Sequence, residues 1–110
     1  MEPPIIANNS GDVLIFASVV EAERYMEPVD VKNKEYVVFD SQGRLLEALV
    51  SGIGKGRERV VLRSSDQAPK HQSELRDTLI NYLSETGELK AKLEACRLDE
   101  LVKKGLRFQR

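Results

Sequence analysis

The segment that most constrains the fold of this chain runs from residue 18 to residue 50. It begins with a helix signal, because Ser18 can accept a hydrogen bond from the backbone three residues on and Glu21 stands at the matching capping-box position. Pro28 ends this helix, since the residue before a proline is pushed out of the α region. Two apolar segments of strand length follow, at residues 35–40 and 44–51.

The rest of the chain supplies further strands and helices around this segment. Asp40-Ser-Gln-Gly43 has the residues that a type I turn prefers, so it joins the two strands as a hairpin. Strands are predicted at residues 12–17 and 58–63. A long helix is predicted at residues 70–86 with Gly87 as its C-terminal cap, and shorter helical turns that end at Gly105 follow it. Residues 1–11 are predicted as loop with a short extended piece at Ile5 and Ile6, and residues 30–35 as a polar connection.

The predicted order of elements is β-α-β-β-β-α-α. Short hairpins with helices gathered outside them are typical of α+β proteins. A length of 110 residues fits one domain, residues 1–110. We therefore expect a single α+β domain with a four-stranded, mostly antiparallel sheet and helices packed on one face.

Charge and cysteine content limit the classes of function. The net charge is −1, which does not favour nucleic acid or an anionic membrane as a partner. The charges are unevenly distributed: residues 1–40 carry eight acidic and three basic side chains, and residues 41–63 carry two acidic and five basic ones. Cys96 is the only cysteine, and neither a secretory signal nor a transmembrane run is present. We expect a cytoplasmic protein with no membrane association.

The glycines at positions 52, 54 and 56 superficially resemble a phosphate-binding loop. Lys55 is followed by Gly56 rather than by Ser or Thr, and the glycines are two residues apart throughout. A phosphate loop must also lead from a strand into a helix, whereas this segment leads into a predicted strand. A glycine-rich hairpin tip is the better interpretation.

No set of residues predicts catalysis, a metal site or a cofactor. His71 is expected to be solvent exposed near a helix start, and Cys96 continues an apolar stripe, so it is expected to pack as a small hydrophobic residue. The acidic residues lack a partnering histidine and the spacing of a calcium loop. We expect a protein that is not an enzyme.

Two charged groups are candidates for binding. The first is an acidic surface for a protein partner, in which Glu23 and Glu27 would share one helical face: Glu21, Glu23, Glu27, Asp30 and Asp40. The second is a basic hairpin that could contact phosphates: Lys55, Arg57, Arg59 and Arg63. This hairpin lacks the stacking aromatics that nucleic-acid binders usually add, and its arginines also fit an exposed strand edge.

The stretch from Ser18 to Leu46, about a quarter of the chain, resembles a group of small bacterial proteins, some of which look like immunity proteins of toxin systems. The resemblance rests on Tyr25-Met-Glu-Pro-Val-Asp30 and on the residues after it, Tyr36, Phe39-Asp40 and Gly43-Arg-Leu. It implies a cytoplasmic protein that neutralises a partner toxin by occluding it, with no catalytic site of its own. The alternatives are a small nucleic-acid-associated regulator that uses the basic hairpin and, third, an enzyme.

Overall fold

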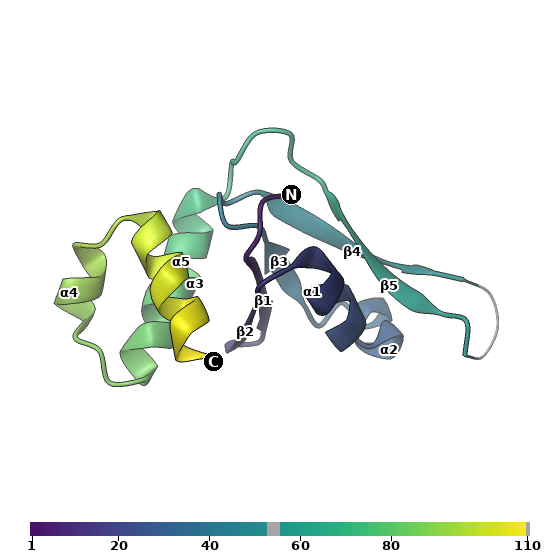
Figure 1. Cartoon of the computed structure of the whole chain (residues 1–110), viewed down its shortest axis with the longest axis horizontal. Coiled ribbons are helices and arrows are strands. Elements are labelled where there is room, and N and C mark those ends of the chain that lie inside the picture. The colour runs from purple at the N-terminus through teal and green to yellow at the C-terminus, as the bar shows by residue number, and fades with distance from the viewer. Residues whose placement is uncertain (53–55, 110) are drawn as a thin grey trace.

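A five-stranded antiparallel sheet with helices on both faces forms the protein (Figure 1). The computed structural model describes residues 1–52 and 56–109. The strands are β1 (Ile5–Asn9), β2 (Asp12–Phe16), β3 (Val37–Phe39), β4 (Leu45–Ser51) and β5 (Arg59–Ser64). The helices are α1 (Val19–Tyr25), α2 (Pro28–Lys32), α3 (Gln72–Glu85), α4 (Lys90–Glu94) and α5 (Leu98–Phe108). The α+β class is confirmed.

The prediction of four strands is wrong because the segment before residue 12 forms β1. The spatial order is β2-β1-β3-β4-β5, so β1 lies inside the sheet and pairs with both β2 and β3. Ser10 and Gly11 close a two-residue hairpin between β1 and β2, with positive φ angles of 52° and 97°. The same Asn, Ser and Gly residues that indicated a loop are those a tight hairpin requires. The order of elements is therefore β-β-α-α-β-β-β-α-α-α.

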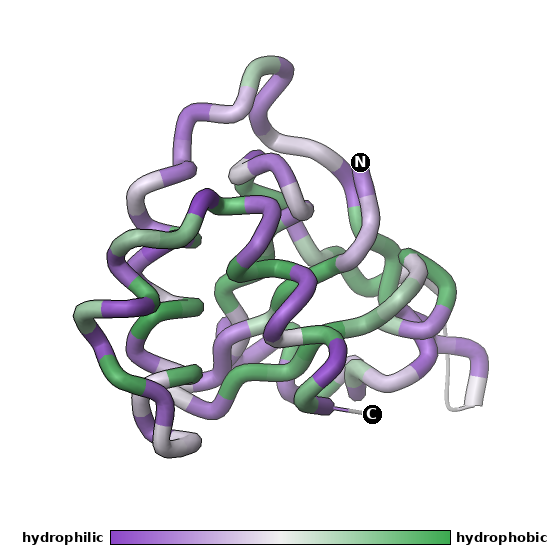
Figure 2. The backbone as a smooth tube through the Cα atoms, turned by 60° about the vertical axis from the view of Figure 1, so that its left-hand side comes forward, coloured by the Kyte–Doolittle hydropathy of each residue, from purple (hydrophilic) through white to green (hydrophobic). Residues whose placement is uncertain are grey.

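The prediction that helices cover one face of the sheet is also wrong. Ile5 and Ala7 of β1 pack in a cluster that includes Ala22 and Met26 of the α1 segment. Ile6 points to the other face, where it packs in a cluster with residues of α3, α4 and α5. The apolar run of β1 thus has a physical reason, since both of its faces are buried. Figure 2 shows hydrophobic segments through the middle of the molecule and hydrophilic loops at its periphery.

Two short helices replace the single helix and polar connection predicted around Pro28. Ser18 caps α1 as expected, and its hydroxyl accepts a hydrogen bond of 3.1 Å from the N–H of Glu21. α1 ends at Tyr25, and Pro28 then begins α2, because proline is well suited to the first position of a helix. The segment of residues 30–35 is therefore largely helical and not an irregular connection.

The last helix does not end at Gly105 but continues to Phe108. Gly105 is buried, and a β-carbon at this position would meet Cδ1 of Ile15 in β2. The glycine thus permits close packing of α5 on the sheet. Gly87 does act as predicted: it has a φ of 104° just after α3, and its N–H donates to the carbonyl of Ser84.

Side chains bond to both edge strands of the sheet. At β2, the side-chain amide of Gln109 accepts a hydrogen bond of 2.7 Å from the N–H of Ile15 and donates one of 2.7 Å to the carbonyl of Val13. At β5, Glu23 accepts a hydrogen bond from the N–H of Leu62. Such contacts oppose pairing of an edge strand with another chain.

Candidate protein-binding surface

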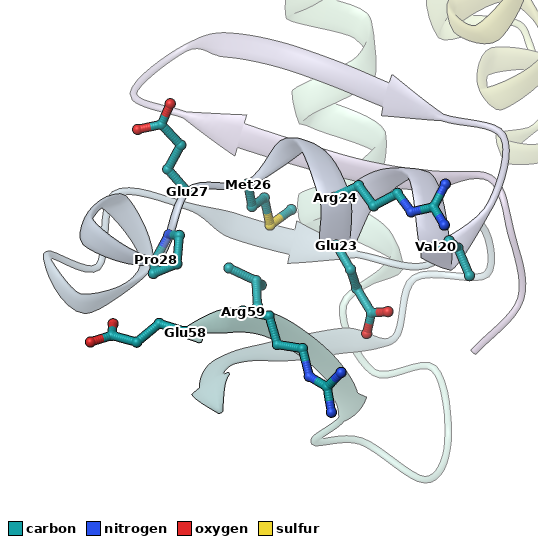
Figure 3. A pocket seen from close by; sticks show the side chains of 9 residues that line it. Val20, Glu23, Arg24, Met26, Glu27, Pro28, Glu58 and Arg59 are labelled. Carbon is teal, nitrogen blue, oxygen red and sulfur yellow. The ribbon is translucent and has the colours of Figure 1, made fainter. Parts of the chain in front are cut away.

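The α1–β5 groove lies where the predicted acidic and basic groups meet. Figure 3 shows α1 above β5, with Glu23 pointing from the helix toward the strand. The groove has a volume of about 370 Å³ and is lined by Val20, Glu23, Arg24, Met26, Glu27, Pro28, Glu58, Arg59 and Val60. It is a depression of mixed charge, with Glu23, Glu27 and Glu58 beside Arg24 and Arg59.

Glu21 and Glu23 both have roles within the fold. The carboxylate of Glu21 accepts a hydrogen bond of 3.2 Å from the N–H of Ala17, just before the start of α1. The carboxylate of Glu23 accepts one of 2.8 Å from the N–H of Leu62. Two of the five predicted acidic residues are therefore engaged by backbone donors.

Glu27 and Asp30 lie beyond α1, so Glu23 and Glu27 do not share a helical face as predicted. Glu27 is exposed and precedes the first residue of α2, and its side chain makes no cap hydrogen bond there. Figure 3 shows the Glu27 carboxylate directed away from β5, opposite to that of Glu23. Asp30 stands in the first turn of α2, where the partial positive charge of a helix N-terminus favours an acidic side chain.

Asp30 lies beside Glu35 and Tyr36. A side-chain hydrogen bond with Asp30, together with the negative charge of Asp30, raises the pKa of the Glu35 carboxyl above its ordinary value. Partial burial of its hydroxyl raises the pKa of Tyr36, and the nearby Asp30, Tyr25, Glu35 and Glu27 raise this pKa further. Asp30, Glu35 and Glu27 thus concentrate negative charge near Tyr36.

We call these five residues the acidic tyrosine surface: Tyr25, Glu27, Asp30, Glu35 and Tyr36. The side chain of Tyr25, the last residue of α1, is 56% exposed and stacks at a tilt on Phe16, with a ring-centroid distance of 5.3 Å. Sequence reasoning also missed Glu35 and Tyr36 as candidates. Their position in the sequence next to the predicted acidic residues was the available signal. The helix α2, which brings Asp30 close to Glu35 and Tyr36, was not predicted.

Asp40 is the one predicted binding residue that the structure buries completely. Its carboxylate accepts hydrogen bonds from the N–H groups of Glu2, Gln42 and Arg44 at 3.1, 3.0 and 2.9 Å, and from the Arg44 guanidinium at 3.2 Å. Burial by itself would raise the pKa of Asp40, but these hydrogen bonds hold the pKa below its usual value. Asp40 organises the turn between β3 and β4, so we exclude it from the binding surface.

The structure brings only some of the predicted basic hairpin residues together. Arg57, Arg59 and Arg63 are exposed, and Arg59 and Arg63 lie on the same face of β5. Arg63 is paired with Glu47 on β4 at 3.1 Å, so part of its charge is balanced within the chain. Lys55 lies outside the described residues.

His71 and Cys96 engage different partners. His71 is half-buried and not exposed as predicted, since its Nδ1 lies 2.5 Å from the Asp66 carboxylate. The N–H of Leu45 is the main cause of a lowered pKa of Asp66, and His71 lowers this pKa further. Cys96 packs against the core and contacts the carbonyl of Lys92 with its Sγ, which confirms its predicted role as a small hydrophobic residue.

Among the residues that the structure describes, no group of three or more His, Cys, Asp or Glu side chains is arranged to hold a metal ion. In the same part of the chain, no helix combines the length and the apolar composition needed to cross a bilayer.

Comparisons with models of protein families, with curated proteins and with solved structures give no match for the chain. The function must therefore be argued from the fold and the surface.

Proposed function

We infer that the protein is a non-catalytic protein-binding module, and that it acts as a bacterial immunity protein that neutralises a partner toxin by occlusion in the cytoplasm. The acidic tyrosine surface is the observation that carries this proposal. Glu27, Asp30, Glu35 and Tyr25 lie near Tyr36, and all five belong to the segment from the last residue of α1 to the residue before β3. The resemblance of this same segment to immunity proteins supports the proposal independently of the geometry.

The chemistry of this surface suits a protein partner. Tyrosine gives a large contact area with few rotatable bonds and a hydroxyl that can hydrogen-bond, so it is enriched at protein interfaces. Val29, which is 55% exposed in α2, adds apolar area to the same segment. Exposed apolar and aromatic area with carboxylates in the same segment is in keeping with the apolar core and charged rim of a typical protein interface.

The acidic residues define the class of partner. Several close carboxylates favour a basic surface, and nucleases that bind nucleic acid have such surfaces. Complementary charge mainly increases the rate of association, and a rim of charge does so without a large cost in desolvation. The net charge of the chain is only −1, so this steering is local to the acidic tyrosine surface.

The nucleic-acid alternative has less support. Of its four predicted contacts, Arg63 is paired with Glu47, and Lys55 lies outside the described residues. Arg57 and Arg59 provide two exposed positive charges, but tyrosine and phenylalanine are not found among the described residues of β4 and β5. Binders of single strands usually combine such charges with stacking aromatics.

Co-expression with a toxic neighbour tests the proposal. The open reading frames beside the gene are expressed one at a time, and any that stops growth is then expressed together with this chain. We expect growth to be restored and the two proteins to co-elute as a complex. The Glu27→Lys/Asp30→Lys variant should restore growth poorly, whereas a Glu85→Lys/Glu94→Lys variant, with the same change in net charge at two exposed positions, should restore it fully.

Two outcomes contradict the proposal. In one, a neighbouring product is toxic but the chain neither restores growth nor binds it. In the other, the double reversal at Glu27 and Asp30 protects cells as well as the wild type does, which removes the acidic tyrosine surface from the interaction.

A further inference from the structure

One face of the β4–β5 hairpin is left without a helix. Along β4, Leu46 and Ala48 point to the side of α1 and pack in the cluster that also contains Val60 and Leu62 of β5. The remaining side chains alternate to the opposite face, where Leu45 packs against the cluster of α3, α4 and α5. Beyond Leu45, the residues of this opposite face belong to neither cluster in the described part of the chain.

The uncovered area has an apolar centre. Leu49 of β4 lies directly opposite Val61 of β5 in the register of the sheet, so their side chains are neighbours on the same face. Val37 precedes Phe39 by two residues on β3 and is therefore on this face, with 47% of its surface exposed. We call these three residues, with Glu47, Arg59 and Arg63 around them, the open sheet face.

The charges of the open sheet face have a predominant sign. Arg59 and Arg63 are exposed and alternate onto this face along the β5 edge, where Arg59 also lines the α1–β5 groove, and Glu47 pairs with Arg63 and offsets only part of their charge. Arg57 is exposed at the start of the same strand and adds to the positive excess. A second copy packed face to face would bring these arginines together, so charge opposes self-association and favours an acidic occupant.

The dimensions fit a single helix. Neighbouring strands are about 4.8 Å apart, so two strands with Val37 beside them match the diameter of a helix, about 10 Å. The five residues 47–51 span about 16 Å along the strand, which is about three turns of helix. Elsewhere in this fold, helices cover the sheet on both faces, with α1 and α2 over the other side of this hairpin (Figure 1).

We propose that the open sheet face of β4 and β5 binds an acidic amphipathic α-helix of a protein partner. The apolar side of that helix contacts Val37, Leu49 and Val61. Its acidic side chains meet Arg59 and Arg63 along the β5 edge. This surface adjoins the acidic tyrosine surface, because Tyr36 precedes Val37 and lines one depression with Glu47 and Leu49, but its occupant has the opposite charge.

A pair of designed peptides tests the proposal on the full-length protein. One is a 15-residue amphipathic helix with leucines on one side and glutamates along its flank, and the other has every glutamate replaced by lysine. We expect the glutamate peptide to shift the amide NMR signals of residues 47–51 and 59–63, and the lysine peptide to leave them unchanged. The shifts should decrease as salt is raised, because both partners are charged at the contact.

Variants locate the contact. Leu49→Thr/Val61→Thr keeps residues that favour strands but removes apolar area, and it should weaken binding of the glutamate peptide at least about tenfold. Leu89→Thr is the matched control, because Leu89 is 65% exposed and lies at the start of α4, far along the chain from the hairpin. The control should bind the peptide as the wild type does.

Several results overturn the proposal. Equal binding of the two peptides shows that charge does not select the occupant, and shifts outside the hairpin show that the site lies elsewhere. A single-stranded oligonucleotide that shifts the same amides at lower concentration than the glutamate peptide assigns this face to nucleic acid instead. These comparisons use the wild-type protein, so they remain decisive even if the double variant fails to fold.

Discussion

The carboxylate of Glu23 accepts a hydrogen bond of 2.8 Å from the backbone N–H of Leu62, which fastens α1 to the outer edge of β5. Leu62 is 3% exposed, so its N–H has little access to water. The bond therefore gives an acidic side chain of the predicted binding group a structural role. It also leaves Glu27, which is exposed, and Asp30, which is half-buried and hydrogen-bonded with Glu35, as the acidic residues of that group proposed to meet a partner.

Replacement of Glu23 tests this role. Glu23→Ala should lower the free energy of unfolding by about 1 to 3 kcal/mol, because it leaves a buried donor without an acceptor. Glu23→Gln should lose less, since the amide oxygen can still accept the bond. Urea denaturation of the three proteins measures the difference, and an Ala variant as stable as the wild type would show that water replaces Glu23 at the edge of β5.

Asp40 should make stability depend on pH. Its pKa is lowered in the folded protein, so its contribution to stability is fully present above the pKa of the unfolded chain, near 4, and is lost as the pH falls through the folded pKa. Asp40→Asn should cost about 2 to 4 kcal/mol at neutral pH, because an amide cannot accept all four hydrogen bonds.

The comparison of unfolding at two pH values checks this assignment. Between pH 6 and about pH 3, wild-type protein should lose more stability than Asp40→Asn, since the variant has no carboxylate to protonate at this turn. Equal losses of stability in the two proteins would mean that other acidic groups govern the sensitivity to acid.

The Gly105→Ala variant should be less stable than the wild-type protein, although alanine is the better helix former by about 1 kcal/mol. The added β-carbon meets Cδ1 of Ile15, so Gly105→Ala should cost about 1 to 3 kcal/mol through overpacking. Ile15→Val removes that carbon, and the double variant should therefore lose less than the sum of the two single changes. Additive losses in thermal unfolding would place the strain elsewhere.

Local signals were sufficient for most elements. Ser18, Gly87 and the Asp40–Gly43 turn each have a backbone role that follows from residue type, and the structure has all three where the sequence indicated them. The failures come from ambiguity in the same signals. Asn9-Ser-Gly11 can belong to a loop or to a two-residue hairpin, and Pro28 can follow one helix or begin the next.

The members of the binding surface were harder to predict, because an acidic side chain that accepts hydrogen bonds from backbone N–H groups of the fold is no longer available to a partner. Nothing local distinguishes Asp40, whose carboxylate is consumed by the fold, from Asp30, which stands at a helix start near the surface. Likewise, the contact between Glu23 and Leu62 spans 39 positions and exists only because α1 packs beside β5. Residue type alone indicated an acidic segment. The tertiary structure determines which of its acidic side chains remain available to contact a partner.

The rate of association with the toxin partner tests the central claim most directly. Stopped-flow mixing is carried out at low and at physiological salt with wild-type protein, Glu27→Lys/Asp30→Lys, and the control Glu85→Lys/Glu94→Lys. The account predicts that the first variant associates at least about tenfold more slowly at low salt, with a smaller difference at physiological salt and little change in thermal stability. Equal association rates for the two folded variants would contradict the account, because they would show that the acidic tyrosine surface does not face the partner.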